Sequence, residues 1–392
     1  MHLGILASHP IQYQAPWFRA LSRECELDVF FAHRQSAAGQ AASGFGVKFD
    51  WDVDLLSGYR HSFLKNVSPA PGVNRFDGCD TPEIFEVIRN GSFDAFIVCG
   101  WYLKSYRQAM GACRAAGVPV LVRGDSQLRT PRPLVKRLAM EFTQRRLMRQ
   151  FDGFLTVGQR NREYLEHFGA PPKKIFSAPH FVDNEWFQTK AASGTSKNEI
   201  RKSWGADAKT IVALFVGKFI PKKHPLDLLR AVVGLRSKVG FSLLPVFIGA
   251  GELENELRNF VRRENLPAHF AGFKNQTELP ACYAAADVLV LPSDGGETWG
   301  LVVNEAMACG CPAIVSEAAG CAPDLIVEGK TGFIFPLGNV EKLKEKLSAF
   351  SDLKSTGHDF AHALSSKLAD FNVAAAVRGT LRAARELAIM KK

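Results

Sequence analysis

The chain has 392 residues and a formal net charge of +10, from 49 Lys or Arg against 39 Asp or Glu. Its length predicts two or three domains, and its hydrophobic content of 46% suffices for real cores. The basic excess favours anionic partners such as nucleotide phosphates, nucleic acid or an acidic membrane face.

Three features indicate the compartment. No apolar run reaches the ~18 residues needed to span a bilayer. The first residues, MHLGILASHPIQYQ, lack the long apolar run and the preceding basic segment of a signal peptide. The eight cysteines show no framework spacing, which is typical of reduced thiols. We therefore expect a soluble, cytoplasmic protein of several domains.

Short apolar runs alternate with helical patterns, which predicts an α/β fold with parallel sheets covered on both faces. In the first half the predicted strands are HLGILA from His2, ELDVFFA from Glu26, DAFIVC from Asp94, VPVLVRG from Val118, GFLTVG from Gly153 and IFSAPH from Ile175. In the second half they are TIVALFVGKF from Thr210, LLPVFIGAG from Leu243, DVLVLPS from Asp287 and CPAIVS from Cys311.

The stretch richest in polar and small residues, QTKAASGTSKNEI at 188–200, predicts a linker between two domains. The domains then cover residues 1–187 and 201–372. Residues 373–392 carry apolar positions at helical spacing and predict a terminal helix. In βαβ domains ligands bind at the carboxyl ends of the strands, so we expect the site in a cleft between the two domains.

Glu297 and Glu305 lie eight positions apart, around the loop GGETWG and a helix, LVVNEAMACG, that Gly310 closes. Backbone N–H groups of the loop and of the helix start favour an anion. Eight helical residues rise ~12 Å, so the two carboxylates suit the two hydroxyl-rich ends of a nucleotide sugar with its diphosphate between them. The alternative is a solvated loop with two unrelated glutamates.

A diphosphate also needs cations, and FVGKFIPKKHP supplies them. Lys218 follows Gly217 at a predicted strand end, and Lys223 comes five residues later. Glycine permits close backbone approach, and two ammonium groups can neutralise a leaving diphosphate. Lys222 is expected to be solvated. The glycine loop in IGAGELENEL is a weaker signal of the same kind, because many strand-to-helix turns look this way.

Together these motifs resemble the retaining glycosyltransferases of family 4, which have the GT-B fold, two Rossmann-like domains facing a cleft. The similarity covers roughly Ile211 to Pro336. It rests on the E-x7-E pair at Glu297 and Glu305 with the small-residue stretch that follows, and on the Gly-Lys-Phe…Lys segment at 217–223. A third stretch, FAGFKNQTELPACYAAADVLVLPS, is similar to the one whose backbone holds the base.

The resemblance implies transfer of a sugar, with retention, from a UDP- or GDP-sugar donor to a glycan or lipid-linked acceptor, without a metal or other cofactor. It implies that Lys218 and Lys223 hold the donor diphosphate and stabilise its departure. Glu297 would bind the sugar, and Glu305 the ribose hydroxyls. The other implied donor-binding positions are Gly217, Gly249, Gly251, Phe273, Lys274, Thr298, Trp299, Gly300, Leu301 and Val302. The family's last helix returns to the first domain.

The acceptor side departs from the family pattern. Many members carry a Gly-Gly loop after the first strand, whereas this chain has SHPIQYQ, whose polar and aromatic residues suit acceptor hydroxyls; its tyrosine equally suits a core. Gly100 and Trp101 occupy the area where many members have a histidine. His180, in the hinge SAPHFVD, is expected to be structural. The expected acceptor-binding residues are His9, Gln12, Tyr13, Gln14 and Asp125, the last with a helix or turn cap as its alternative role.

Two further motifs predict no site. Asp52 and Asp54 have the spacing of a metal-binding pair without its context, and we expect no metal site. Gly329, before Lys330 and Thr331, lacks the other glycine and the strand of a P-loop.

The basic excess is concentrated in RTPRPLVKRLAMEFTQRRLMR, Arg129 to Arg149, with seven Lys or Arg and one acid. Leu134, Leu138 and Phe142 recur there at helical spacing. One hypothesis is that this face rests on anionic lipid, at the inner face of the cytoplasmic membrane, and reaches a lipid-linked acceptor. The alternative is a solvated face above a core stripe. The segment lacks interleaved aromatics, and no nucleic-acid-binding motif is present, so we expect no nucleic-acid partner.

Two other functions stay open. Another GT-B enzyme, such as a nucleotide-sugar epimerase, would need different acids and bases in the cleft, and a phosphorylase would need a cofactor-bound lysine; neither motif stands out. A non-catalytic nucleotide-sugar-binding protein would bind the donor without turnover.

Overall fold

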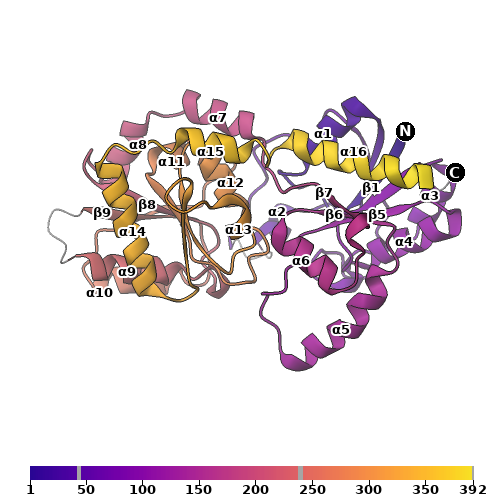
Figure 1. Cartoon of the computed structure of the whole chain (residues 1–392), viewed down its shortest axis with the longest axis horizontal. Helices are drawn as coiled ribbons and strands as arrows, with labels where there is room; N and C mark the ends of the chain where they lie inside the picture. The colour runs from indigo at the N-terminus through magenta and orange to yellow at the C-terminus, as the bar shows by residue number, and fades with distance from the viewer. Residues whose placement is uncertain (42–45, 237–241, 391–392) are drawn as a thin grey trace.

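The computed structural model describes residues 1–41, 46–236 and 242–390. Within them the chain forms two parallel sheets, each flanked by helices, which lie beside each other as two domains (Figure 1). The first sheet has the strand order β3-β2-β1-β4-β5-β6-β7, and the second has the order β10-β9-β8-β11-β12-β13. The α/β fold of two parallel-sheet domains predicted from the alternating pattern is confirmed, as is the pair of Rossmann-like domains that the resemblance implied.

The elements of the first domain are β1 (His2–Ala7), α1 (Ala15–Glu24), β2 (Glu26–Phe31), α2 (Ala37–Gln40), β3 (Arg60–Phe63), η2 (Phe76–Gly78), α3 (Ile84–Asn90), β4 (Ala95–Val98), α4 (Lys104–Ala116), β5 (Val120–Gly124), α5 (Leu134–Met148), β6 (Gly153–Thr156), α6 (Gln159–His167), η3 (Pro172–Lys174) and β7 (Ile175–Ser177). They are followed by α7 (Asn184–Ser193), α8 (Lys197–Trp204), β8 (Ile211–Val216), η4 (Pro221–Lys223), α9 (Pro225–Leu235), β9 (Leu243–Ile248), α10 (Glu254–Arg263), β10 (His269–Gly272), α11 (Leu279–Ala285), β11 (Val288–Leu291), α12 (Leu301–Ala308), β12 (Ala313–Ser316), α13 (Ala322–Leu325), β13 (Gly332–Phe335), α14 (Val340–Ser355), α15 (Ala361–Leu368) and α16 (Val373–Met390).

The first sheet is covered on both faces. Side chains alternate along a strand, so Leu3 and Ile5 of β1 join one core while Leu6 joins the other. The core on the Leu3 side includes Trp17 of α1 and Leu381 of α16. The terminal helix α16 thus returns to the first domain, as Figure 1 shows, and the predicted terminal helix is confirmed over its described residues. Residues 391–392 of the predicted segment lie outside the described residues.

The predicted linker differs from the structure. Residues 188–200 lie largely in α7 and α8, which pack against α11 of the second domain. The polar composition that suggested a linker belongs to helix ends, because Ser196 and Glu199 form a reciprocal capping box at the start of α8. The chain crosses between the sheets earlier, between β7 and α7.

Three of the described strands were not predicted from the sequence pattern. β3 and β10 lie at sheet edges, and β3, with the sequence RHSF, is mostly exposed. β10 is only partly buried, so neither of these two strands carries the continuous buried apolar run that marks a central strand. β13 lies at the other edge of the second sheet and follows the EGKTG turn. The strands that position the cleft, β8, β9 and β11, are buried throughout and were predicted.

Candidate active site

A cavity of about 380 Å³ lies between the domains, at the carboxyl ends of β8, β9 and β11. Parallel α/β sheets bind ligands at this edge, where the strand order reverses. The predicted residues that line it are Gln12, Tyr13, Asp125, Gly217, Lys218, Lys223, Gly249, Phe273, Lys274, Glu297, Thr298, Trp299, Gly300, Leu301, Val302 and Glu305. Of the predicted set, His9, Gln14 and Gly251 are outside the lining.

Two neighbouring turns form the floor of the cavity. Val216 and Ile248 are partners in the β8–β9 pair, so Gly217 and Gly249 follow them side by side. Gly249 has φ +138°, and a Cβ there would lie 2.0 Å from the carbonyl oxygen of Gly217, so no other residue fits. Gly251 instead packs against the backbone of Phe219, which leaves no room for a Cβ. Packing of the chain therefore explains why a glycine stands at this position.

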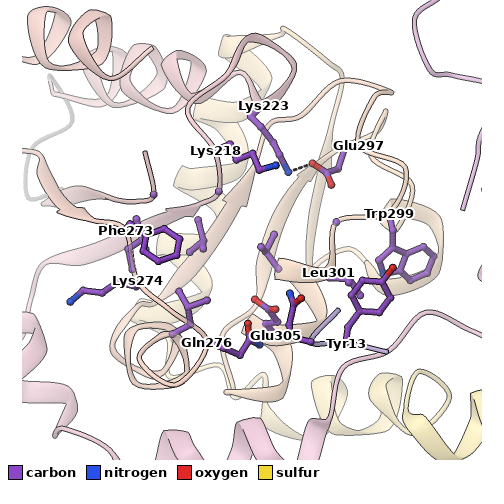
Figure 2. A pocket seen from close by; sticks show the side chains of 18 of the residues that line it. Tyr13, Lys218, Lys223, Phe273, Lys274, Gln276, Glu297, Trp299, Leu301 and Glu305 are labelled. Carbon is purple, nitrogen blue, oxygen red and sulfur yellow. Dashed lines mark hydrogen bonds and ion pairs between the residues drawn. The ribbon is translucent and has the colours of Figure 1, made fainter. Parts of the chain in front are cut away.

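Two lysines and a glutamate converge at one end of the cavity. Lys223 forms an ion pair with Glu297, and their side chains are only 12% and 13% exposed (Figure 2). Burial by itself would raise the pKa of Glu297, but the Lys223 ammonium holds that pKa below its usual range. Burial and the ammonium groups of Lys223 and Lys222 lower the pKa of Lys218 to about 8. This end of the cavity therefore concentrates positive charge that one carboxylate only partly balances.

Lys222 also lines the cavity, against the expectation of plain solvation. Its Nζ donates to the carbonyl oxygen of Gly296 over 3.3 Å, and its own carbonyl accepts from the N–H of Asp294 over 2.9 Å. The lysine segment and the glutamate loop are thereby joined through the backbone.

Backbone hydrogen bonds from a neighbouring turn hold the loop that carries Glu297. The N–H of Gly320 donates to the carbonyl of Glu297 over 3.0 Å, and the N–H of Cys321 donates to that of Trp299 over 3.0 Å. Gly300, at φ +106°, caps α12 in the left-handed region. The small residues after the E-x7-E pair therefore let a second strand–helix turn pack against this loop.

Glu305 lies in α12 at a different end of the cavity from Glu297 (Figure 2). It is 6% exposed and accepts a 2.6 Å hydrogen bond from the Tyr283 hydroxyl. Burial raises the pKa of Glu305, and the hydrogen bonds from Tyr283 and Gln276 only partly offset that effect. A carboxylate in this place retains acceptor capacity toward the cavity.

The first domain contacts the Glu297 loop directly. Thr298 Oγ1 donates to Asp125 Oδ2 over 2.6 Å. Gln127, fully buried, directs Nε2 at the carbonyl oxygens of Gly295 and Glu297, at 3.0 and 2.9 Å, and at that of Ala318, at 3.1 Å. Sequence reasoning missed this glutamine; its place in GDSQL, two residues after Asp125 at a strand end, is the signal that could have found it.

His180 lies in the cavity lining rather than in a purely structural position. Its ring meets Tyr13 edge-on at 5.6 Å and lies 5.4 Å from the Trp299 ring. Burial, with the Arg123 guanidinium, holds its pKa well below the usual range, so the imidazole is neutral. Among the described residues, neither His180 Nδ1 nor Gln12 Oε1 has a hydrogen-bond partner.

The two other predicted acceptor residues serve local structure. His9 contacts the hydroxyl of Ser8 over 2.9 Å, and burial lowers its pKa to about 4. Gln14 is buried and stands at the start of α1. Both belong to the loop after β1, from which only Gln12 and Tyr13 reach the cavity lining.

An aromatic segment of the first domain, missed from the sequence, reaches the second domain. Trp51 lines the cavity, and the ring of Phe49 lies 4.5 Å from that of Phe273. Asn275 Nδ2 donates to the carbonyl of Asp50 over 2.8 Å.

Asp52 belongs to the same contact. Its carboxylate accepts the N–H of Thr277 at 3.2 Å and the Thr277 hydroxyl. Asp54 accepts the N–H groups of Leu56 and Ser57, at 3.0 and 3.1 Å. In the described part of the chain no three His, Cys, Asp or Glu side chains are grouped so as to hold a metal ion.

Comparison with known proteins agrees with this geometry. Residues 196–365 match the family described as glycosyl transferases group 1. The chain is 38% identical over 169 residues to the sulfoquinovosyl transferase SQD2 of Arabidopsis thaliana, covering 42% of this chain and 31% of that protein. It is 32% identical over 210 residues to a GDP-mannose-dependent alpha-mannosyltransferase of Mycobacterium tuberculosis, covering 53% and 50%. The match thus spans half or less of the length of these two relatives.

The fold is also found in solved structures. HepE of Anabaena, crystallised in complex with UDP, superposes with a TM-score of 0.70 at 16% identity, over 97% of this chain and 99% of that one. At that identity the likeness concerns the fold alone. The E-x7-E pair and the lysine segment lie inside residues 196–365. The chain therefore has the GT-B fold, and residues 196–365, in its second domain, are similar to the group 1 glycosyl transferases.

Proposed function

We propose that this protein transfers a sugar from a nucleoside diphosphate donor to a glycan or lipid-linked acceptor, with retention of configuration and without a metal ion. One observation carries the proposal: Lys218, Lys223 and Glu297 meet at one end of an interdomain cavity that also holds Glu305. Support also comes from the family match and from the nucleotides in the names of similar proteins, GDP-mannose in one relative and UDP in a solved neighbour.

The donor would replace the internal ion pair. In the free protein Lys223 is bound to Glu297. A diphosphate between Lys218 and Lys223 would take over the lysine, and Glu297 would turn to the sugar hydroxyls. The ammonium groups then stabilise the charge that develops on the leaving diphosphate, which is the role usually given to a metal. Glu305 would accept from the ribose hydroxyls.

The acceptor would enter beside the first domain. Gln12, Tyr13 and His180 line that side of the cavity, and the neutral imidazole can accept or donate a hydrogen bond but carries no charge. In retaining transfer the acceptor hydroxyl approaches on the face that the diphosphate leaves, and a phosphate oxygen takes its proton. This route needs no protein nucleophile.

A thermal-shift screen tests donor binding. The protein is heated with UDP, GDP, ADP and their common sugars in EDTA. A ligand at about a hundred times its dissociation constant stabilises the fold by roughly 2.7 kcal/mol. A shift with one nucleotide identifies the donor, and NMR of the product's anomeric proton then tests retention. No shift with any of them contradicts the proposal. Binding without hydrolysis or transfer favours a non-catalytic nucleotide-sugar-binding protein, and interconversion of the free donor favours an epimerase.

A further inference from the structure

The helix α5 presents apolar side chains to solvent. Leu134, Val135, Leu138 and Phe142 are 68%, 80%, 70% and 77% exposed. From the sequence, this segment was either a lipid-binding face or a solvated face above a core stripe. The prediction of a core stripe is wrong for these four residues, because they are exposed. Met140, Leu147 and Met148 on the other side of the helix make its contact with the domain core. Figure 1 shows α5 projecting from the first domain, away from both sheets.

Basic side chains adjoin this apolar stripe, which comprises Leu134, Val135, Leu138 and Phe142. At 100° per residue, Arg145 and Arg149 continue the same face toward the end of the helix. By the same spacing Arg146 lies beside the stripe, whereas Lys136 lies toward the side of Met140 and Leu147. Arg132 and Arg137 are the other basic residues of the segment. The single acid, Glu141, is bound to His167 over 2.7 Å and to Arg145 over 3.3 Å.

Most of these cations lack an internal partner. Within the described ranges, no acidic side chain forms an ion pair with Lys136, Arg137, Arg146 or Arg149. Exposed apolar side chains in one row mark an interaction surface, and a basic rim selects a negative partner. A second copy of the chain would bring two basic helices together, so the charges disfavour self-association.

We propose that α5 docks on an anionic phospholipid bilayer, with the apolar stripe inserted among the acyl chains and the basic rim on the headgroups. A bilayer offers hydrocarbon directly beneath a layer of negative charge, which matches both features of the helix. None of the described helices is both long and apolar enough to cross a membrane.

The docked helix would hold the cleft near the lipid surface. Residues 125–133 join the cavity to α5, and Asp125 and Gln127 in this segment hydrogen-bond to the second domain. Arg129 Nη1 also donates to the carbonyl of Glu317 over 3.2 Å. Docking combined with the proposed sugar transfer indicates that the acceptor is lipid-linked. This inference about the acceptor rests on the proposed function.

Vesicle co-sedimentation of the full chain tests the docking. We expect the protein to pellet with vesicles of phosphatidylcholine and phosphatidylglycerol, to be released by salt, and to remain soluble with phosphatidylcholine alone. Arg146→Gln with Arg149→Gln should weaken binding about 25-fold, at about fivefold for each basic residue near the surface. The matched control, Arg262→Gln with Arg263→Gln on α10, loses the same charge and should change binding less than twofold.

The stripe is tested separately. Leu138→Ser with Phe142→Ser should weaken binding at least about tenfold, because it removes two inserted apolar side chains. Equal binding to neutral and anionic vesicles, or unchanged binding of both double variants, would overturn the proposal. So would a parent dimer in light scattering that becomes monomeric in the stripe variant. The nucleotide thermal shift of each variant should equal that of the parent; vesicle binding without any nucleotide shift would refute the proposed function and leave the docking intact.

Discussion

The two walls of the cleft are made of different kinds of groups. The wall on the second domain, where we propose that the donor binds, is called the donor wall; it combines glycine turns at residues 217 and 249 with the buried Lys223–Glu297 ion pair. The wall on the first domain, where we propose that the acceptor binds, is called the acceptor wall; it is formed by Gln12, Tyr13, Asp125 and His180. Most of its groups are uncharged, and two polar atoms lack partners among the described residues. The donor wall can therefore neutralise a strong anion, whereas the acceptor wall is suited to hydroxyl groups.

This difference predicts that charge loss on the donor wall has the largest effect. Lys223→Ala and Glu297→Ala should each lower the transfer rate by at least about 10²–10³-fold, because each removes a preorganised charge at the reacting centre. The rate is measured by nucleotide release with saturating donor. Lys222→Ala, at a neighbouring and more exposed lysine, is the matched control and should lose much less.

Melting temperatures separate effects on catalysis from effects on folding in these variants. Either single substitution leaves a buried charge unpaired, whereas Lys223→Ala with Glu297→Ala removes both. The double variant should melt at a higher temperature than either single variant and still be inactive. Near-normal turnover of either single variant would refute the role assigned to that residue.

The next effect tests how far the first domain positions the donor wall. Gln127→Leu removes the donor to three carbonyl groups of the second domain, two of them in the Glu297 loop. Displacing a catalytic group by about 1 Å costs on the order of 10²-fold in rate. We expect a fall of that order in kcat, with the KM for the donor changed much less. Gln127→Glu, of the same shape, should be worse, because its carboxylate faces three carbonyl oxygens; activity equal to the parent would refute the positioning role.

The donor wall could be predicted from the sequence and the acceptor wall only in part, for a physical reason. The lysine segment and the E-x7-E pair are local motifs next to buried strands, so spacing along the chain gives spacing in the site. Gln127, Trp51 and His180 reach the cavity only because two domains meet there. Their neighbours are up to 191 residues away, as for Gln127 and Ala318, and no local pattern marks them.

The same contrast holds for the fold. Central strands such as β8 are buried on both faces and are visible in the sequence as apolar runs. The edge strand β3 is mostly exposed and has no such run. The polarity of residues 188–200 reflects helix capping, which composition alone does not distinguish from a linker. In α5, helical spacing was visible, but which side of the helix faces the core was not.

A smaller effect concerns the charge of Lys218. Its pKa of about 8 lies below the ordinary value of 10.5 because of burial and the neighbouring lysines. A bound diphosphate would keep this lysine charged, so donor binding should take up a proton above pH 8. Donor affinity should then fall as the pH rises above 8, by up to about tenfold per pH unit, until the lysine also loses its proton in the complex.

Calorimetry in buffers of different ionisation enthalpy measures this proton uptake. The stability of the free protein depends on pH in the opposite direction from donor affinity. Between pH 8 and 10.5 the unfolded chain holds the Lys218 proton more tightly than the folded chain does. The contribution of Lys218 to the free energy of unfolding therefore rises with pH in this window. Lys218→Arg stays charged across the range and should flatten the affinity profile. A slope that persists in this variant would assign the titration to another group.

The smallest effect is expected where the walls meet at the surface. Asp52 accepts hydrogen bonds from the backbone and hydroxyl of Thr277 across the domain boundary. Exposed charged contacts of this kind contribute little, so Asp52→Ala should weaken donor binding only about two- to fivefold, through a less favoured closed arrangement. Asp50→Ala is the matched control, because Asp50 bonds to Asn275 through its backbone carbonyl and the substitution leaves that bond in place. Titration with the nucleotide found in the thermal-shift screen measures both variants. Equal weakening in the two would mean that general charge near the cleft, and not this contact between the walls, sets the affinity.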